Sequence, residues 1–333
     1  MSDTKRRNSR GYIASLVVTA VSVAVAAFLV FNRQIIVDNV YAWQYEPTSE
    51  ISAFAERTGM SAKGKFLFYA SQPSLEGTQA FNEQCSRIEK STAILGCYDG
   101  RQIYIYDVPN QKLDGIREVT GAHEMLHAAY IRLSEKNKKE VDALLDVEYD
   151  KIKDNAEFSE RMEFYARTEP GERHNELHSI IGTEIADISE SLEEYYRQYF
   201  ADRSKTVALH GQYASVFAEL QARGKELSEQ LTLLADQIDS NTAAYNAAVS
   251  QLNQDIAAFK SQAENGGFSS QEELDRALNA LIARSTQLDR RLVAIKEDRE
   301  TYNALREELV VIASESEALN RSIDSSLAPA PSL

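Results

Sequence analysis

The stretch that decides the fold is Thr120-Gly121-Ala122-His123-Glu124-Met125-Leu126-His127-Ala128-Ala129-Tyr130. Its composition predicts a helix that contains the pattern H-E-x-x-H. Residues four apart on a helix share one face, with about 5–6 Å between their Cβ atoms. His123 and His127 therefore suit two ligands of one tetrahedral zinc ion. Glu124 can reach a metal-coordinated water and take its proton, so the stretch predicts a hydrolytic zinc site.

Length, charge and histidine content support this interpretation. A chain of 333 residues has room for one or two domains with a buried core. The net charge of −15 argues against a nucleic-acid partner, because phosphate binding needs a basic surface. The chain has only 5 histidines, and four of them fall within residues 122–179. Such clustering is typical of a metal site.

The N-terminus predicts a membrane anchor. A basic tail, residues 1–10, precedes an uncharged apolar run over residues 11–31. That run has roughly the 20 residues that a membrane-spanning helix needs. Basic residues stay on the cytoplasmic side, so the chain after Asn32 is expected outside the cytoplasm. A cleaved signal peptide is the alternative, but the length of the run and its bulky end at Phe28–Phe31 favour an uncleaved signal anchor. We expect a single-pass cell-membrane protein with a cytoplasmic N-terminus.

The two cysteines indicate a disulfide. Cys85 and Cys97 have eleven residues between them, with no C-x-x-C pair. Disulfides persist in oxidising compartments, which fits an extracytoplasmic domain. As zinc ligands, the pair would supply only half a site.

The elements before the H-E-x-x-H stretch are predicted to be short. Residues 33–47 are expected to form a membrane-proximal connector, followed by an amphipathic helix that begins near Thr48. Strand composition marks residues 65–70 and 101–108, and the second of these follows a hairpin-type turn at Asp99-Gly100. The fold class is therefore α+β, with a small sheet.

Helices dominate the chain after His127. Helical patterns cover residues 134–155 and 156–167 and end at a breaker, residues 168–171. Over residues 204–324, apolar residues recur at spacings of three, four and seven, and a capping box at residues 270–273 restarts the pattern after a Gly-Gly break. This predicts an antiparallel α-helical coiled-coil hairpin with arms on the order of 80 Å, suited to dimerisation or to docking a partner. Residues 325–333 are expected to be a disordered tail.

A catalytic zinc ion needs a third protein ligand. Downstream, residues 175–179 read N-E-x-x-S. With H-E-x-x-H, this pattern resembles the gluzincin metallopeptidases, the thermolysin-like division of the zincins, whose third ligand is a Glu on a later helix. The resemblance covers residues 121–130 and 175–179. It implies Glu176 as the third ligand and a zincin-like catalytic domain over about residues 46–203. Ile180 stands where the thermolysin branch has an Asp that orients a ligand histidine.

Other third ligands remain open. Glu184 would share a helical face with apolar residues, and a metal is one partner that a carboxylate needs there. His178, alone or with His174, offers imidazole instead, but these point about 200° away from Glu176 on a helix. Residues 194–202 resemble the E-x-x-A-D helix of some membrane gluzincins, with Gln198 in the Glu position. The order of preference is Glu176, Glu184, His178.

The resemblance implies a membrane-anchored zinc metallopeptidase that hydrolyses protein or peptide substrates outside the cytoplasm. Glu124 is the expected base. His178 or a tyrosine of residues 195–199 could donate to the oxyanion, although packing in the core is the favoured interpretation of these tyrosines. In zincins an edge strand upstream of this helix pairs with substrate, and residues 101–108 are expected to do so. The alternative function is a membrane-anchored coiled-coil scaffold with a non-catalytic zincin domain. Ile180 favours the scaffold, whereas the intact Glu124 favours the enzyme.

Overall fold

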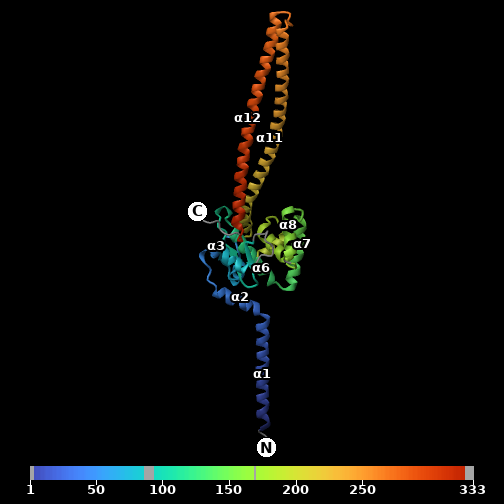
Figure 1. Cartoon of the computed structure of the whole chain (residues 1–333). Helices are drawn as coiled ribbons and strands as arrows, with labels where there is room; N and C mark the ends of the chain where they lie inside the picture. The colour runs from blue at the N-terminus through green and yellow to red at the C-terminus, as the bar shows by residue number, and fades with distance from the viewer. Residues whose placement is uncertain (1–3, 86–93, 169, 327–333) are drawn as a thin grey trace. The chain divides into compact units, whose positions relative to one another are not determined.

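The computed structural model describes residues 4–85, 94–168 and 170–326. The chain divides into two compact units: Phe217–Ala318 form one, and the residues before and after that segment form the other. The first unit is mainly helical, with one three-stranded sheet, and the second consists of two long helices (Figure 1).

The first two helices follow each other closely along the chain. Helix α1, Thr4–Phe31, contains the apolar span Tyr12–Phe31, which has a mean hydropathy of 2.6 and is long enough for a membrane anchor or a signal sequence. Helix α2, Arg33–Gln44, begins after Asn32, whose carbonyl accepts a hydrogen bond from Ile36 at 3.0 Å. Residues 33–44 of the expected membrane-proximal connector are therefore helical.

The structure has a helix at residues 65–70, where the sequence predicted a strand, so that prediction was wrong. Helix α3, Ser49–Arg57, begins where the sequence predicts, with Thr48 as its N-cap, and it is followed by helix α4, Ala62–Ala70. The Ser61 hydroxyl caps α4 by accepting from the Gly64 amide at 3.1 Å. Gly64, Leu67 and Phe68 are buried, which is the three- and four-residue spacing of a helix face. Short apolar runs do not distinguish strand from helix, and here packing decides.

The sheet has the strand order β1-β3-β2. Strand β1, Ser74–Glu76, pairs in parallel with β3, Ile103–Tyr106, and β2, Gly96–Tyr98, pairs antiparallel with β3. Asp99-Gly100 forms the predicted turn, since Asp99 Oδ1 accepts from the amides of Arg101 and Gln102. The strand predicted at residues 101–108 is thus central, not an edge, and the edge strand beside α6 is β2.

A disulfide joins β2 to the end of helix α5, Thr78–Gln84. It links Cys85 to Cys97 as predicted, with a Cα–Cα distance of 5.9 Å. The bond therefore fixes the edge strand covalently to a neighbouring helix.

Helix α6, Ile116–Ile131, carries the H-E-x-x-H pattern through the middle of the first unit. Most of its residues are buried, and it packs against α3, α4, the sheet and helix α9, Arg173–Glu184. Further helices follow α6 or α9 in the chain: α7, Glu135–Ile152, α8, Ala156–Thr168, and α10, Glu190–Tyr196. A short 3-10 turn, η1, lies before α6 at Gln111–Leu113. The core is thus organised around α6.

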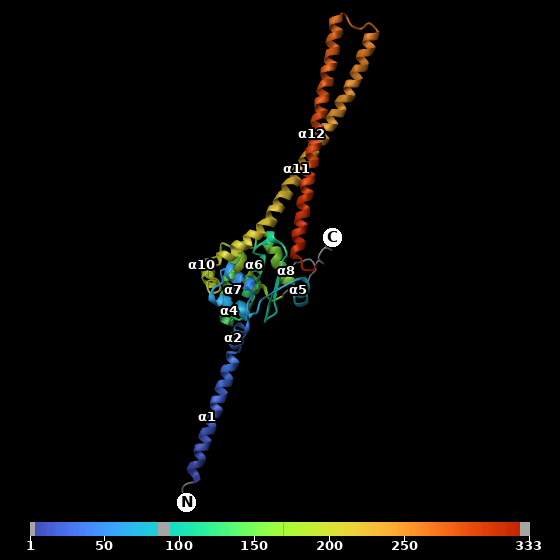
Figure 2. The same ribbon diagram turned by 90° about the vertical axis from the view of Figure 1, so that its left-hand side faces the viewer.

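The two long helices are α11, Ser204–Glu264, and α12, Gln271–Ile323. In both views their parts in the second unit run side by side and are joined by a short turn (Figures 1 and 2). Arg223 pairs with Glu308 at 2.6 Å and Arg284 with Asp255 at 2.5 Å. The Ser270 hydroxyl accepts from the Glu273 amide at 3.3 Å, as the capping box predicts.

Both ends of this pair continue into the first unit. The division falls inside α11, after Val216, later than the boundary predicted at residue 204. Just after the C-terminal end of α12, Ser325 is buried and donates to Asn82 Oδ1 at 2.8 Å. The tail predicted over residues 325–333 is therefore held by the fold at Ser325. Its residues from 327 onward lie outside the described residues.

The disulfide is expected to stabilise the edge strand. In Cys85→Ser/Cys97→Ser, opening of β2 should become easier by about 3 kcal/mol, the usual effect of closing a loop of this size. Amide hydrogen exchange in β2 should accelerate by roughly a hundredfold. Wild-type protein in reductant should match the variant, and unchanged exchange in both would contradict the prediction.

Candidate metal centre

Helices α6 and α9 bring three metal-ligating side chains together. His123 and His127 stand one turn apart on α6, and Glu176 comes from the first turn of α9. The two helices approach closely at Gly182, where an added Cβ would lie 2.5 Å from Leu126 of α6. A larger residue at 182 would displace the Leu126 and Tyr196 side chains, so the packing of α9 against α6 is close at this glycine.

The distances between the three donors suit a single ion. The two Nε2 atoms lie 3.0 Å apart, and Glu176 Oε1 is 3.4 Å from His127 Nε2. Glu176 Oε2 is 3.8 Å from His123 Nε2. Ligand atoms at 2.0–2.1 Å from a tetrahedral ion lie roughly 3.3 Å from one another. The group His123, His127 and Glu176 can therefore hold a metal ion.

Asn175 orients the second histidine. Its Oδ1 lies 3.0 Å from His127 Nδ1, and its Nδ2 donates to Glu172 Oε2 at 3.0 Å. Because the amide oxygen only accepts, His127 Nδ1 carries the proton and its Nε2 presents a lone pair to the centre. A ligand histidine usually needs such a partner, and Asn175 supplies it from the residue next to Glu176.

The first histidine is held in the form that binds metals. Burial lowers the pKa of His123 well below its ordinary value, and the neighbouring His127 and Arg161 lower it further. The imidazole is therefore neutral at physiological pH, and neutral imidazole is the ligand form. Ile180, at the position of the missing Asp, is fully buried in the core.

The rival third ligands have other partners, although Glu184 lines the same cavity as the three donors. Glu184 pairs with Arg161 at 2.8 Å and His210 at 3.4 Å. His178 is buried, with its Nε2 2.9 Å from the Tyr195 hydroxyl. His174 faces Asp146 on α7 at 3.1 Å, and Gln198 accepts from Lys63 at 2.5 Å. Of the ligands predicted from the sequence, the structure groups Glu176 with the two histidines.

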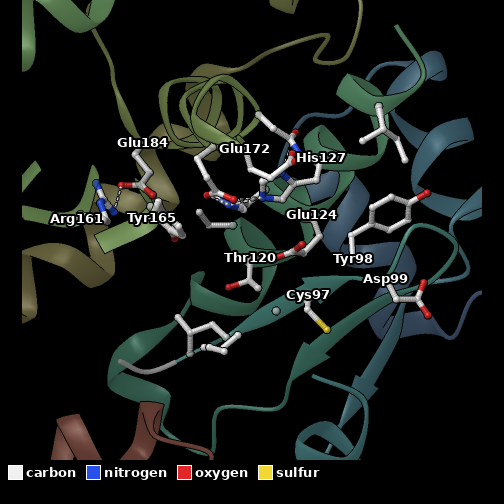
Figure 3. Close-up of a pocket in the computed structure, with 18 of the residues that line it drawn as sticks. Cys97, Tyr98, Asp99, Thr120, Glu124, His127, Arg161, Tyr165, Glu172 and Glu184 are labelled. Carbon is white, nitrogen blue, oxygen red and sulfur yellow. Dashed lines mark hydrogen bonds and ion pairs between the residues drawn. The ribbon is translucent and has the colours of Figure 1, made fainter. Parts of the chain in front are cut away.

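The three donors line a cavity of about 650 Å³. Strand β2 borders one side, α6 and α9 provide the donors, and Arg161 and Tyr165 come from α8. Figure 3 shows Glu124 and His127 together, with Arg161, Tyr165 and Glu184 to one side and Tyr98 and Asp99 to the other.

Strand β2 approaches α6 closely at Gly96. A Cβ at this position would lie 2.8 Å from Glu124 Oε1 and 2.6 Å from the Thr120 methyl group. Any larger side chain would therefore displace Glu124. The Glu124 carboxylate is buried next to the strand, on the same helix turn as the two histidines.

The expected oxyanion donors do not line this cavity among the residues described. His178 is enclosed by Tyr130, Tyr195, Tyr196 and Tyr199, with ring centroids 5.4–6.1 Å away. These tyrosines therefore pack in the core, as the favoured interpretation of the sequence has it, and His178 is buried with them rather than in the cavity. Three other tyrosines line the cavity: Tyr98 on β2, Tyr165 on α8 and Tyr213 on α11.

Sequence reasoning missed Asn175, Gly96, Tyr165 and Arg161. Asn175 is the first residue of the N-E-x-x-S pattern, so the sequence did carry a signal for it. The contributions of Gly96 and α8 depend on packing between segments distant in the sequence. Local patterns carry no signal for them.

The chain was compared with family models, with curated protein sequences and with solved structures, and nothing matches it.

Metal content separates the candidate ligands. Glu176→Gln should lose the bound metal, because a neutral amide replaces the charged donor, whereas Glu184→Gln should retain it. Elemental analysis of purified variants after dialysis measures this. Loss of metal in Glu184→Gln alone would overturn the ligand group.

Asn175 should tune metal affinity. Asn175→Leu, nearly the same size, removes the acceptor for His127 Nδ1–H and should weaken metal binding by about 10–100-fold. Competition with a chromophoric chelator measures the change. Glu172→Gln is the matched control, since its amide oxygen still accepts from Asn175 and affinity should stay close to that of the wild type. Equal affinity in Asn175→Leu and wild type would contradict the assignment.

Proposed function

We propose that the protein is a membrane-anchored zinc metallopeptidase that cleaves protein or peptide substrates outside the cytoplasm. One observation carries the proposal: the Glu124 carboxylate lines the same cavity as the two imidazoles and the carboxylate that can hold a metal ion. A base beside a three-donor centre is the arrangement that metal-assisted hydrolysis needs.

The donor chemistry fits zinc. Two imidazoles and one carboxylate form a common catalytic zinc set, with a fourth position left open. When bound, zinc would polarise the scissile carbonyl and lower the pKa of a water molecule. The residues His123, His127 and Glu176 would hold it.

Glu124 is the proposed general base. It neighbours His123 in sequence and lies on the cavity wall, where it can take the proton of the attacking water and pass it to the leaving amine. Gly96 leaves just enough space for its carboxylate beside β2. The close approach of the strand thus positions the base.

Tyr165 is the proposed donor to the developing oxyanion. Burial and the nearby Glu176 carboxylate raise the pKa of its phenol above the ordinary value. The hydroxyl therefore keeps its proton at neutral pH and can donate a hydrogen bond to a substrate oxygen. Arg161, one turn earlier on α8, lines the same side of the cavity, where it pairs with Glu184.

The edge strand supports a peptide substrate. Strand β2 pairs with β3 on one side, and its residues Gly96–Tyr98 line the cavity. An extended peptide can add to such an edge through main-chain hydrogen bonds. This gives β2 the role that was expected for residues 101–108.

The anchor and the disulfide support an extracytoplasmic location. Helix α1 can span a bilayer, and its basic N-terminal residues favour the cytoplasmic side. The Cys85–Cys97 bond is typical of an oxidising compartment.

We further infer that α11 and α12 form a coiled-coil hairpin for docking a partner or a second copy. Buried leucines at 227, 231, 252 and 288, together with the ion pairs between the helices, support this.

Glu124→Gln tests the proposed function. The variant should keep its metal but hydrolyse an unstructured protein about 10²–10⁴-fold more slowly, because the amide cannot accept the proton. Proteolysis is followed by release of new amino termini. Glu140→Gln, an exposed position on α7, is the control. Unchanged hydrolysis would rule out Glu124 as the base, and an inactive metal-loaded wild type would favour the scaffold.

A further inference from the structure

We propose that helix α2 lies in the interfacial layer of a lipid bilayer, with Ile35, Ile36, Val40 and Trp43 inserted among the lipids. The proposal rests on the proposed membrane anchoring by α1. It adds a second membrane contact, made by a helix of the first unit.

The two faces of α2 differ in exposure. Val37, Asp38, Tyr41 and Ala42 face the first unit and are buried or half-buried. The opposite face presents large apolar side chains to the outside: Ile35 is 64% exposed, Val40 43% and Trp43 84%, and Ile36 lies between them at 37%.

The apolar face is almost uninterrupted. At about 100° per residue, these four side chains cover the side opposite Tyr41, with Asn39 among them. The Asn39 amide donates to the Ile35 carbonyl at 2.7 Å, so one of its N–H groups is already satisfied within the helix. The face has no acidic residue, and Arg33 stands at its edge.

Contacts on the inner side fix the orientation of α2. Asp38 accepts two hydrogen bonds from Arg132, at 2.8 and 2.9 Å, just after the end of α6. Arg132 also donates to the Tyr98 hydroxyl at 2.9 Å. Rotating α2 to hide its apolar face would break this buried ion pair, whose loss is costly. The apolar face therefore stays outward.

Chain continuity identifies lipid as the occupant. The apolar span of α1 ends at Phe31, and α2 begins two residues later at Arg33 (Figure 1). If α1 spans the bilayer, α2 must start at its surface. Amphipathic helices with Trp on the apolar face bind at this depth, and Trp is enriched at the interface.

Trp43 is the only tryptophan in the chain and reports directly on this contact. The full chain is reconstituted in phosphatidylcholine vesicles whose acyl chains carry bromine. We expect blue-shifted Trp43 emission, strong quenching by the brominated lipid and little quenching by aqueous iodide. Water-like emission with iodide quenching would overturn the proposal. Protection from iodide without bromine quenching would indicate a protein occupant, such as a second copy, and would overturn it as well.

A second tryptophan position separates this proposal from that of the anchor. In Trp43→Phe/Leu29→Trp, the single tryptophan lies in α1. Bromine quenching at position 29 but not at 43 would refute the α2 proposal alone. Absence of quenching at position 29 would refute the anchor, and the α2 proposal with it.

A charge on the apolar face should weaken the lipid contact. Val40→Glu should reduce bromine quenching of Trp43 at least twofold, while Val147→Glu, the same change at an exposed position on α7, should leave it unchanged. Metal content should equal that of the wild type in both variants. Equal quenching in Val40→Glu and wild type would contradict the proposal.

Discussion

The packing of α9 against α6 determines whether a metal centre exists at all. Two ligands come from one helix and one from the other, and the two helices pack closely at Gly182. Helix α10 packs against α9 near this contact, and its Tyr196 hydroxyl donates to the His178 carbonyl of α9 at 2.7 Å. Close-packed interiors transmit displacements, so small changes in this core would alter distances between the donors.

The sequence predicted the site better than it predicted the surroundings. The helix of residues 120–130, the helix that begins near Thr48 and the disulfide follow from local patterns. Glu176, which the structure groups with His123 and His127, came from a resemblance to a known family, with Glu184 and His178 left open. The strand order, the helix at residues 62–70 and the contribution of α8 depend on contacts between distant segments. Periodicity describes one element at a time and carries no information about its neighbours.

Ile180 illustrates how a motif can differ while its physical requirement is still met. The missing Asp removes one way to orient a ligand histidine, but Asn175 binds His127 Nδ1 from the opposite end of the same short pattern. A neutral amide fixes the tautomer as an Asp would, without adding a negative charge beside Glu172 and Glu176. The requirement concerns an acceptor at the ring nitrogen, not a particular residue type.

The Cys85–Cys97 bond also bears on when the cavity is completed. Cys97 follows Gly96 directly, so the strand that touches Glu124 is the strand that the disulfide holds. A chain made in a reducing cytosol acquires this bond only after it reaches an oxidising space. Until this bond forms, only non-covalent contacts hold this wall of the cavity, so completion of the cavity depends on the redox state of the compartment in which the chain folds.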